Sequence, residues 1–173
     1  KLLLGAAGIG DIHGEADVPQ KLAGHAGARH AVASNQAIFA VVALQAEFGM
    51  SLIFISHDLS VVRQIAHRVM VLYLGRIVEL APRDAIYTGA RHPYTKALLS
   101  ATPHPEPTRK RERIVLTGEL PSPIKPPPGC TFHPRCPLAF ATCRIENPAL
   151  LAQGGSRVAC HAVNGTKTEA EVA

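Results

Sequence analysis

The chain has 173 residues with a net charge of +5; 47% of them are hydrophobic and only 5% are aromatic. This length suits one ordinary domain or two small ones, with a core made mainly of aliphatic side chains. The densest basic run, residues 109–113, is short and lies among prolines, which indicates a solvated linker rather than a nucleic-acid surface. No apolar stretch approaches the roughly 18 residues needed to span a bilayer.

The first third of the chain carries two different patterns. Residues 1–33 are rich in small residues without a clear apolar period, so we expect irregular structure there. They begin without Met, and we expect a piece of a longer chain or a start in a wrong reading frame. Apolar residues spaced three and four apart then predict a helix from Asn35 to about Phe48, capped by Ser34 and ended by Gly49.

The segment that organises the chain is the apolar run Leu52–Ile55, which predicts a strand buried on both faces. The run stops at three polar residues, Ser56-His57-Asp58, and a helix is predicted from about Leu59 to Ala66. Open α/β sheets bind ligands at such strand ends, which makes His57 a candidate site residue. The alternative is that His57 merely caps the helix. We expect Asp58 to cap it rather than to form a catalytic dyad with His57.

A hairpin and two short helices are predicted next. Two β-rich runs between Arg68 and Leu80 flank Leu74-Gly75-Arg76, a tight turn. One helix is predicted from about Pro82 to Gly89 and another from His92 to about Ala101, each with proline near its first turn. Residues 92–95 form either a docking element or part of ordinary helix packing. Tyr73 is interpreted as a residue on one face of the hairpin.

Proline dominates the following region, where 11 of the 14 prolines lie between Pro103 and Pro148. Proline lacks the backbone donor and fixes φ, so long regular elements are excluded there. We predict a short strand at residues 114–116 and at most a short helix near residues 137–143. The rest of residues 130–161 is expected to be loop.

All four cysteines lie in this region with the spacing C-x5-C-x6-C-x16-C: Cys130, Cys136, Cys143 and Cys160. Four thiolates can hold a tetrahedral metal ion or an iron–sulfur cluster, can form two disulfides, or can stay free. The wide spacing favours a cluster, whose corners are further apart than the ligands of one ion. His133 and His161 are alternative ligands, although we expect local hydrogen bonds from both. Arg135 is placed to offset thiolate charge.

Taken together and in order, these stretches resemble the end of the ATP-binding subunit of a peptide-type ABC transporter (dipeptide, oligopeptide or nickel). The resemblance covers about residues 34–163. The stretches that carry it are Phe54-Ile55-Ser56-His57-Asp58-Leu59, the hairpin of residues 68–79, Arg91-His92-Pro93-Tyr94-Thr95 and Gly129-Cys130-Thr131-Phe132-His133-Pro134-Arg135-Cys136.

The resemblance implies a role for His57 as the switch histidine, which reaches the γ-phosphate of ATP and helps organise the attacking water. ATP and Mg²⁺ are the implied cofactors of the intact subunit, and a 4Fe–4S cluster on the four cysteines is implied as well. The implied partners are a second ATPase subunit and membrane permeases, at the cytoplasmic face of the membrane. No nucleic-acid partner is expected.

Several motifs of the family are missing from the sequence. There is no Gly-x-x-x-x-Gly-Lys-Ser/Thr phosphate loop, no stretch like Leu-Ser-Gly-Gly-Gln and no aliphatic strand ending in Asp-Glu. Without the backbone donors of the phosphate loop, we do not expect this chain alone to hydrolyse ATP. The alternative hypothesis is a non-enzymatic interaction module stabilised by a metal or cluster, without nucleotide binding.

The expected fold class is therefore α/β, the C-terminal remnant of a P-loop ABC ATPase domain followed by a small loop-rich cysteine module. We divide the chain into an unassigned segment over residues 1–33 and the ATPase remnant over residues 34–101. The remaining parts are a linker over residues 102–113, the Pro/Cys-rich extension over residues 114–163 and a tail over residues 164–173.

Overall fold

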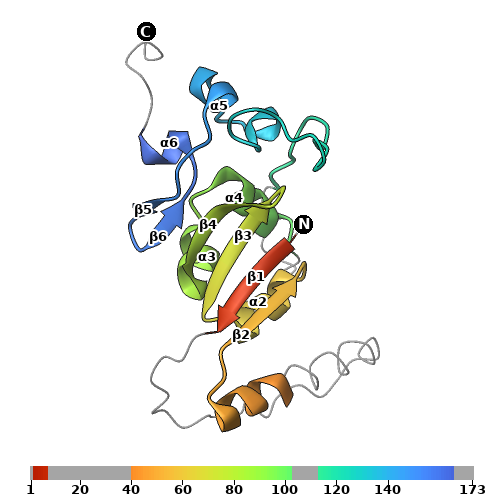
Figure 1. Cartoon of the computed structure of the whole chain (residues 1–173), viewed down its shortest axis with the longest axis vertical. Helices are drawn as coiled ribbons and strands as arrows, with labels where there is room; N and C mark the ends of the chain where they lie inside the picture. The colour runs from red at the N-terminus through yellow and green to blue at the C-terminus, as the bar shows by residue number, and fades with distance from the viewer. Residues whose placement is uncertain (1, 8–39, 103–112, 166–173) are drawn as a thin grey trace.

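The computed structural model describes residues 2–7, 40–102 and 113–165 (Figure 1). Its strands are β1 (Leu2–Ala7), β2 (Leu52–Ser56), β3 (Arg68–Tyr73), β4 (Arg76–Pro82), β5 (Leu151–Gln153) and β6 (Ser156–Val158). Its helices are α2 (Leu59–Ile65), α3 (Arg83–Gly89), α4 (Pro93–Ser100), α5 (Ala141–Ile145) and α6 (His161–Asn164), with a 3₁₀ turn η1 (His133–Arg135) and a helical segment over residues 40–48. None of the described helices has the length and apolar character that crossing a membrane requires.

The strands form one antiparallel sheet with the order β2-β1-β3-β4-β6-β5 (Figure 1). We expected irregular structure over residues 1–33, and this is wrong for Leu2–Ala7, which form β1 between β2 and β3. The remainder of that segment lies outside the described residues. The α/β class is confirmed in the broad sense of mixed helices and strands.

The organising strand β2 is the outermost strand on one side of the sheet, and it is not buried on both faces as expected. Ile53 is 72% exposed and Ile55 is 54% exposed, whereas Leu52 and Phe54 are half-buried. This alternation has a simple cause: α2 packs beside β1 and β2, and the opposite face of β2 has little cover.

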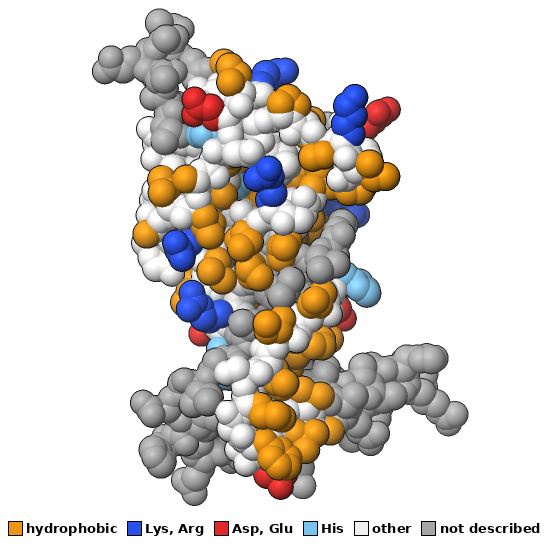
Figure 2. All heavy atoms as spheres, viewed as in Figure 1, with side chains coloured by type: hydrophobic (Ala, Val, Ile, Leu, Met, Phe, Trp, Pro, Cys, Tyr) orange, Lys and Arg blue, Asp and Glu red, His pale blue; other side chains and the backbone are white. Residues whose placement is uncertain are grey.

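The helical segment before β2 confirms part of the predicted helix, since residues 40–48 are helical and Gly49 follows with φ +61°. The amide of Met50 closes the end by donating to the carbonyl of Gln45 at 3.2 Å. The predicted start, residues 34–39, lies outside the described residues. The apolar face expected on this helix is largely exposed, at Val41, Val42 and Phe48 among others (Figure 2).

The central hairpin β3–β4 is confirmed. Its two turn residues, Leu74 (φ +47°) and Gly75 (φ +76°), both have positive φ, the conformation of a type I′ turn that matches the twist of the strands. A second hairpin, β5–β6, was not predicted, although Gly154 and Gly155 form an equivalent turn. Strand β6 pairs with β4, so the cysteine-rich region adds strands to the sheet instead of standing apart.

The core is shared between the hairpin and the cysteine-rich region. Its aliphatic part includes Val62, Val69 and Ile86, all fully buried. Its aromatic part is formed by Tyr73, Tyr94 and Phe132, with ring centroids 4.8 to 5.4 Å apart. Phe132 lies in the extension defined from sequence, yet it is buried in the same core as residues of the hairpin.

Helices α2, α3 and α4 agree with the predicted ones, and α5 overlaps only the end of the range near residues 137–143 where a short helix was predicted. The predicted strand at residues 114–116 is wrong, because this segment has no regular secondary structure. Side chains replace a strand partner: the amide of Ile114 donates to Ser100 Oγ at 3.0 Å, and Arg135 donates to the carbonyl of Leu116 at 3.4 Å.

Candidate functional site

His57 lies in the exposed turn between β2 and α2, as the sequence predicted. The neighbouring Asp58 caps α2: its Oδ1 accepts from the amide of Ser60 at 2.9 Å and from that of Val61 at 3.4 Å. The hydrogen bond from the Ser60 side chain is the main reason why the pKa of Asp58 lies below its usual value. The capping role of Asp58 is therefore confirmed.

Helix α3 holds this turn in place. The hydroxyl of Tyr87 donates to the carbonyl of Leu59, the first residue of α2, at 2.5 Å. The guanidinium of Arg63 lies 5.4 Å from the Tyr87 ring centroid. Burial raises the pKa of Tyr87 to about 12, so its hydroxyl remains a donor at any physiological pH. The side chain of His57 is exposed, and among the described residues no hydrogen bond to its imidazole is found.

The four cysteines gather at the other edge of the sheet, around η1, α5 and the start of α6, and all four are free thiols. The amide of Cys130 donates to the carbonyl of Cys143 at 2.9 Å. Gly129 allows this approach, since it has φ +66° and a Cβ there would lie 2.6 Å from the Cys143 carbonyl oxygen. The fold thus brings cysteines that are 13 residues apart against each other.

Burial raises the pKa of three of these thiols, Cys130, Cys136 and Cys160, and that of Cys136 reaches about 11. Repulsion from the neighbouring thiolates acts in the same direction. Backbone amides oppose it by donating to sulfur: Phe132 and His133 to Cys130, Leu138 to Cys136, and Ala162 and Val163 to Cys160. Cys130, Cys136 and Cys160 are therefore neutral at pH 7, in surroundings that provide donors for a thiolate.

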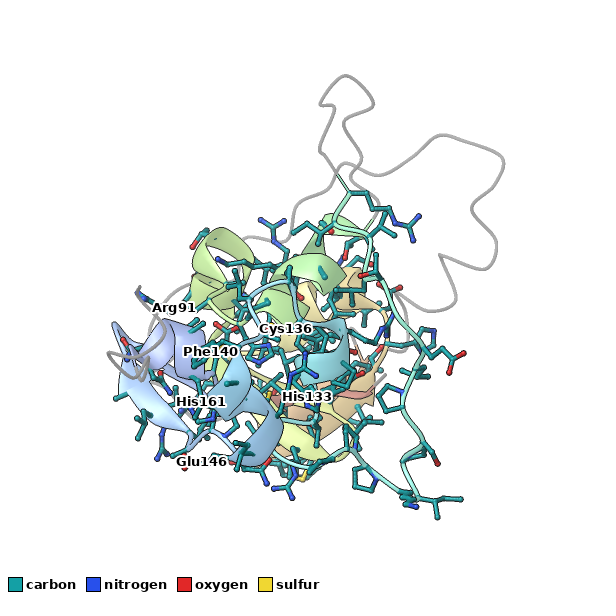
Figure 3. The ribbon with its side chains drawn as sticks, turned by 90° about the horizontal axis from the view of Figure 1, so that it is seen from above. Arg91, His133, Cys136, Phe140, Glu146 and His161 are labelled. Atoms are coloured by element: carbon teal, nitrogen blue, oxygen red, sulfur yellow. The ribbon has the colours of Figure 1, made fainter. Side chains whose placement is uncertain are left out.

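The arrangement does not fit a single metal ion. In the part of the chain that the structure describes, no three His, Cys, Asp or Glu side chains are grouped closely enough to hold one ion. His133 makes the local hydrogen bond that we expected, between Nδ1 and the Cys130 carbonyl at 2.9 Å (Figure 3). For His161 the expectation of a local bond is wrong, because its Nε2 lies 3.0 Å from the carbonyl of Glu146, 15 residues earlier in the chain. Arg135 differs from expectation, because its guanidinium bonds the carbonyl of Leu116.

Sequence reasoning missed the buried polar pair that joins the sheet to α4. Glu79 is fully buried on β4 and accepts from the amides of Arg91 at 2.8 Å and His92 at 3.0 Å. His92 is also buried; its Nδ1 accepts from the amide of Tyr94 at 3.1 Å, and burial lowers its pKa to about 4. A glutamate within the apolar run Ile77–Leu80 was the available signal.

Residues 92–95 therefore pack within the molecule, the simpler of the two interpretations that the sequence allowed. Tyr94 and Thr95 are buried, and His92 caps α4. Tyr73 is buried as well, at the centre of the aromatic core. The strand order separates the two predicted sites, because His57 follows β2 at one edge of the sheet while Cys160 follows β6 near the other.

Part of the chain matches a known protein family. Residues 78–143 match the family described as the oligopeptide/dipeptide transporter, C-terminal region. This part of the chain is similar to the C-terminal region of that transporter family. The matched residues include Tyr94 and Phe132 of the aromatic core, the Glu79–His92 pair and three of the four cysteines.

Curated relatives extend the similarity beyond that region. The chain is 60% identical over 119 residues to a probable peptide ABC transporter ATP-binding protein of Sinorhizobium fredii, which covers 68% of this chain and 34% of that protein. It is 58% identical over 121 residues to the dipeptide transport ATP-binding protein DppF of Escherichia coli, covering 70% and 36%. The predicted resemblance to ATP-binding subunits of peptide transporters is confirmed, and the chain spans about a third of the length of these relatives.

Proposed function

We propose that this chain is part of the ATP-binding subunit of an ABC importer for peptides, a subunit that couples ATP binding and hydrolysis to solute import. Any stretch of 121 residues in a chain of 173 includes residues 53–121, so the identity to the dipeptide transport protein extends over His57 and α4. This extent favours an origin in the ATP-binding subunit over the alternative of an interaction module unrelated to nucleotide.

In the intact subunit, His57 contacts the γ-phosphate of ATP and helps to orient the attacking water. The observation that supports this role is the exposed imidazole on a turn held by Asp58 and Tyr87. A donor fixed by the fold stabilises developing charge without reorganising. ATP and Mg²⁺ need a phosphate loop and acidic residues that the given sequence does not contain, so His57 supplies one contact of a larger site.

The proposed partners are a second ATPase subunit and the permease subunits, at the cytoplasmic face of the membrane. The names of the relatives support this assembly, since each is an ATP-binding protein of a peptide transporter. The α/β remnant would supply the turn of His57, and the extension would remain attached to it through the shared core around Phe132.

A chimera tests the proposal. The matching 121 residues of the Escherichia coli dipeptide transport protein are replaced by those of this chain, and uptake of a labelled dipeptide is measured in a strain that lacks the native gene. We expect transport, and we expect His57→Ala to lower it by about a hundredfold, the usual effect of removing one donor to a reacting group. The control His67→Ala removes another exposed histidine and should transport normally. A normally expressed chimera without transport, or unchanged transport with His57→Ala, would contradict the proposal.

For the extension we propose that the four cysteines hold a 4Fe–4S cluster, which would crosslink η1, α5 and α6 without taking part in ATP hydrolysis. Two observations support it: the thiols interact with one another, and backbone amides donate to three of the sulfurs.

The cluster is tested on the full chain by anaerobic reconstitution with iron and sulfide. We expect visible absorbance, bound iron and sulfide, and an increased unfolding temperature, with all three reduced in Cys136→Ser. Because the thiols must lose their protons, loading should improve with rising pH. Stoichiometric zinc binding with no iron uptake would refute the cluster.

A further inference from the structure

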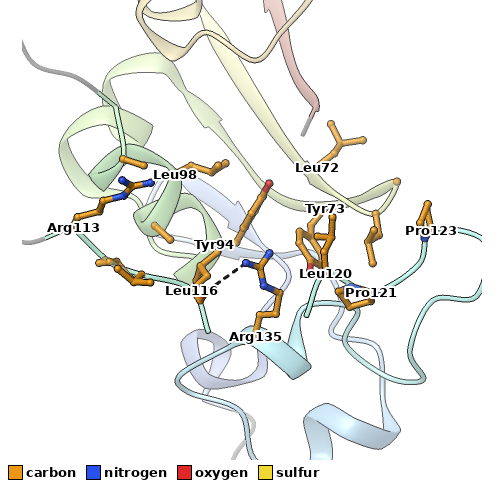
Figure 4. A pocket seen from close by; sticks show the side chains of 16 residues that line it. Leu72, Tyr73, Tyr94, Leu98, Arg113, Leu116, Leu120, Pro121, Pro123 and Arg135 are labelled. Carbon is orange, nitrogen blue, oxygen red and sulfur yellow. Dashed lines mark hydrogen bonds between the residues drawn. The ribbon is translucent and has the colours of Figure 1, made fainter. Parts of the chain in front are cut away.

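A cavity of about 930 Å³ lies between the β3–β4 turn, the second half of α4 and the irregular segment 113–123 (Figure 4). This volume is in the range of roughly 300–1,000 Å³ that small-molecule sites occupy. The residues that line the cavity include neither His57 nor any of the four cysteines. Its role is therefore separate from both.

The walls of the cavity are apolar. Leu72 comes from β3, Leu98 from α4, and Leu116 and Leu120 from the irregular segment. That segment has no helix or strand, and Leu120 is 69% exposed at its edge. An exposed apolar side chain at the rim of a cavity gains burial when a ligand with an apolar body enters.

Two polar groups in the cavity lack partners. The hydroxyl of Tyr73 and Nε of Arg135 are buried, and neither forms a hydrogen bond with the described residues. Arg135 is held only by a long bond of 3.4 Å from another guanidinium nitrogen to the carbonyl of Leu116, drawn as a dashed line in Figure 4. Buried donors without acceptors are unfavourable, so both would gain from a ligand that brings acceptor atoms.

The charge of the lining defines the ligand further. Among the lining residues, only Arg113 and Arg135 are charged, and no acidic residue or histidine is present. The guanidinium of Arg135 also lies near Tyr94, where its charge lowers the pKa of that tyrosine against the larger, opposite effect of burial. A carboxylate matches these donors in charge and in shape, since guanidinium groups bind carboxylates through two parallel hydrogen bonds.

We propose that this cavity binds a small monocarboxylate with an apolar body. The carboxylate accepts hydrogen bonds from Arg135 and the Tyr73 hydroxyl, and the apolar body packs against Leu98, Leu116 and Leu120. No acidic side chain lines the cavity to pair with a cationic group, so a zwitterionic peptide of equal size binds less well than an acid without an amino group. The proposal does not depend on nucleotide binding or on a cluster.

Calorimetry on the full chain tests this with octanoate as the probe. Octanamide of the same length lacks the charge, and the dipeptide Leu-Leu carries an additional ammonium. We expect octanoate to bind at least about tenfold more tightly than either, as hydrogen bonds from charged groups to a buried acceptor imply. Equal affinity for octanoate and octanamide, tighter binding of the dipeptide, or no binding of octanoate at all would overturn the proposal.

Variants locate the site. Tyr73→Phe removes only the hydroxyl and keeps the ring packed on Tyr94 and Phe132, so the fold is preserved while octanoate affinity falls by about tenfold. Leu120→Asp places a negative charge at the rim and should abolish octanoate binding. The matched control Leu138→Asp changes a leucine that is 52% exposed and does not line the cavity, and its affinity should equal that of the unmodified chain. Unchanged octanoate binding by folded Tyr73→Phe and Leu120→Asp would rule this cavity out as the site.

Discussion

The two sides of the sheet differ in how completely they bury apolar side chains. On the β2 side, Ile53, Ile55 and Phe48 expose more than half of their side chains, and Val41, Val42 and Leu44 of the helix over residues 40–48 are also exposed. On the β4 side, Tyr73, Phe132 and their neighbours are buried in one continuous core. The β4 side therefore has most of what a stable unit needs, whereas the β2 side depends on cover that the described residues do not provide.

The largest expected effect concerns the buried core. Phe132→Ala removes the ring at the centre of the aromatic group and should lower the free energy of unfolding by about 3–5 kcal/mol, measured by urea denaturation. The comparison residue Leu138, which is largely exposed, should change stability by less than about 0.5 kcal/mol when replaced by Ala. A small effect of Phe132→Ala would show that the extension does not share the core.

The pH dependence of stability tests the buried His92. Its pKa falls from 6.5 to about 4 on folding, so between these values the unfolded state binds more protons than the folded state. Stability should therefore be complete above pH 6.5 and should decline as the pH falls, by up to about 3 kcal/mol near pH 4. His92→Asn keeps a capping side chain but cannot titrate, so its unfolding free energy should fall less over this window. Parallel pH profiles for the two proteins would show that His92 does not contribute.

A smaller effect is expected at Glu79. Glu79→Gln leaves one side-chain oxygen for two amide donors, those of Arg91 and His92, and places an amide nitrogen against the other donor. We expect a loss of about 1–3 kcal/mol in the free energy of unfolding and faster amide exchange at His92. Glu47→Gln, at an exposed position of the helix over residues 40–48, is the matched control for the same exchange and should be nearly neutral. Protection of the His92 amide that survives Glu79→Gln would contradict this account.

The smallest effect on stability is expected on the β2 side. Ile53→Thr keeps a β-branched side chain on a strand position that is 72% exposed, so unfolding should change by less than about 0.5 kcal/mol. Light scattering should nevertheless show less self-association, because the apolar patch is reduced. Unchanged self-association together with a large stability loss would mean that Ile53 is covered in solution.

Local chemistry made much of the fold predictable. The turn Leu74-Gly75, the cap Asp58 and the prolines at helix starts each act over a few residues, and all appear where the sequence predicted them. The β-forming residues 114–116 predicted a strand that is not present. Their backbone groups form hydrogen bonds with the side chains of Ser100 and Arg135 instead of with a neighbouring strand. A β-preference alone does not supply a neighbouring strand.

The candidate sites likewise divide into those predictable from nearby residues and those that depend on long-range packing. The position of His57 at a strand end and the local hydrogen bond of His133 follow from their immediate neighbours in sequence and were predictable, whereas the bond between His161 and Glu146 joins residues 15 positions apart and was not. The cavity with Tyr73 and Arg135 was not, because it joins residues that are 62 positions apart and depends on which polar atoms remain without partners.

By itself, the sequence determined the local elements between residues 50 and 101 and the resemblance of the chain to ATP-binding subunits of peptide transporters. The tertiary structure alone decided that the cysteine-rich region adds strands to the sheet, that Phe132 completes the core, and that β2 is exposed on one face. The reason is that turns and caps depend on residues a few positions apart, whereas burial, strand partners and unpaired donors depend on long-range packing, which a single strand's pattern does not specify.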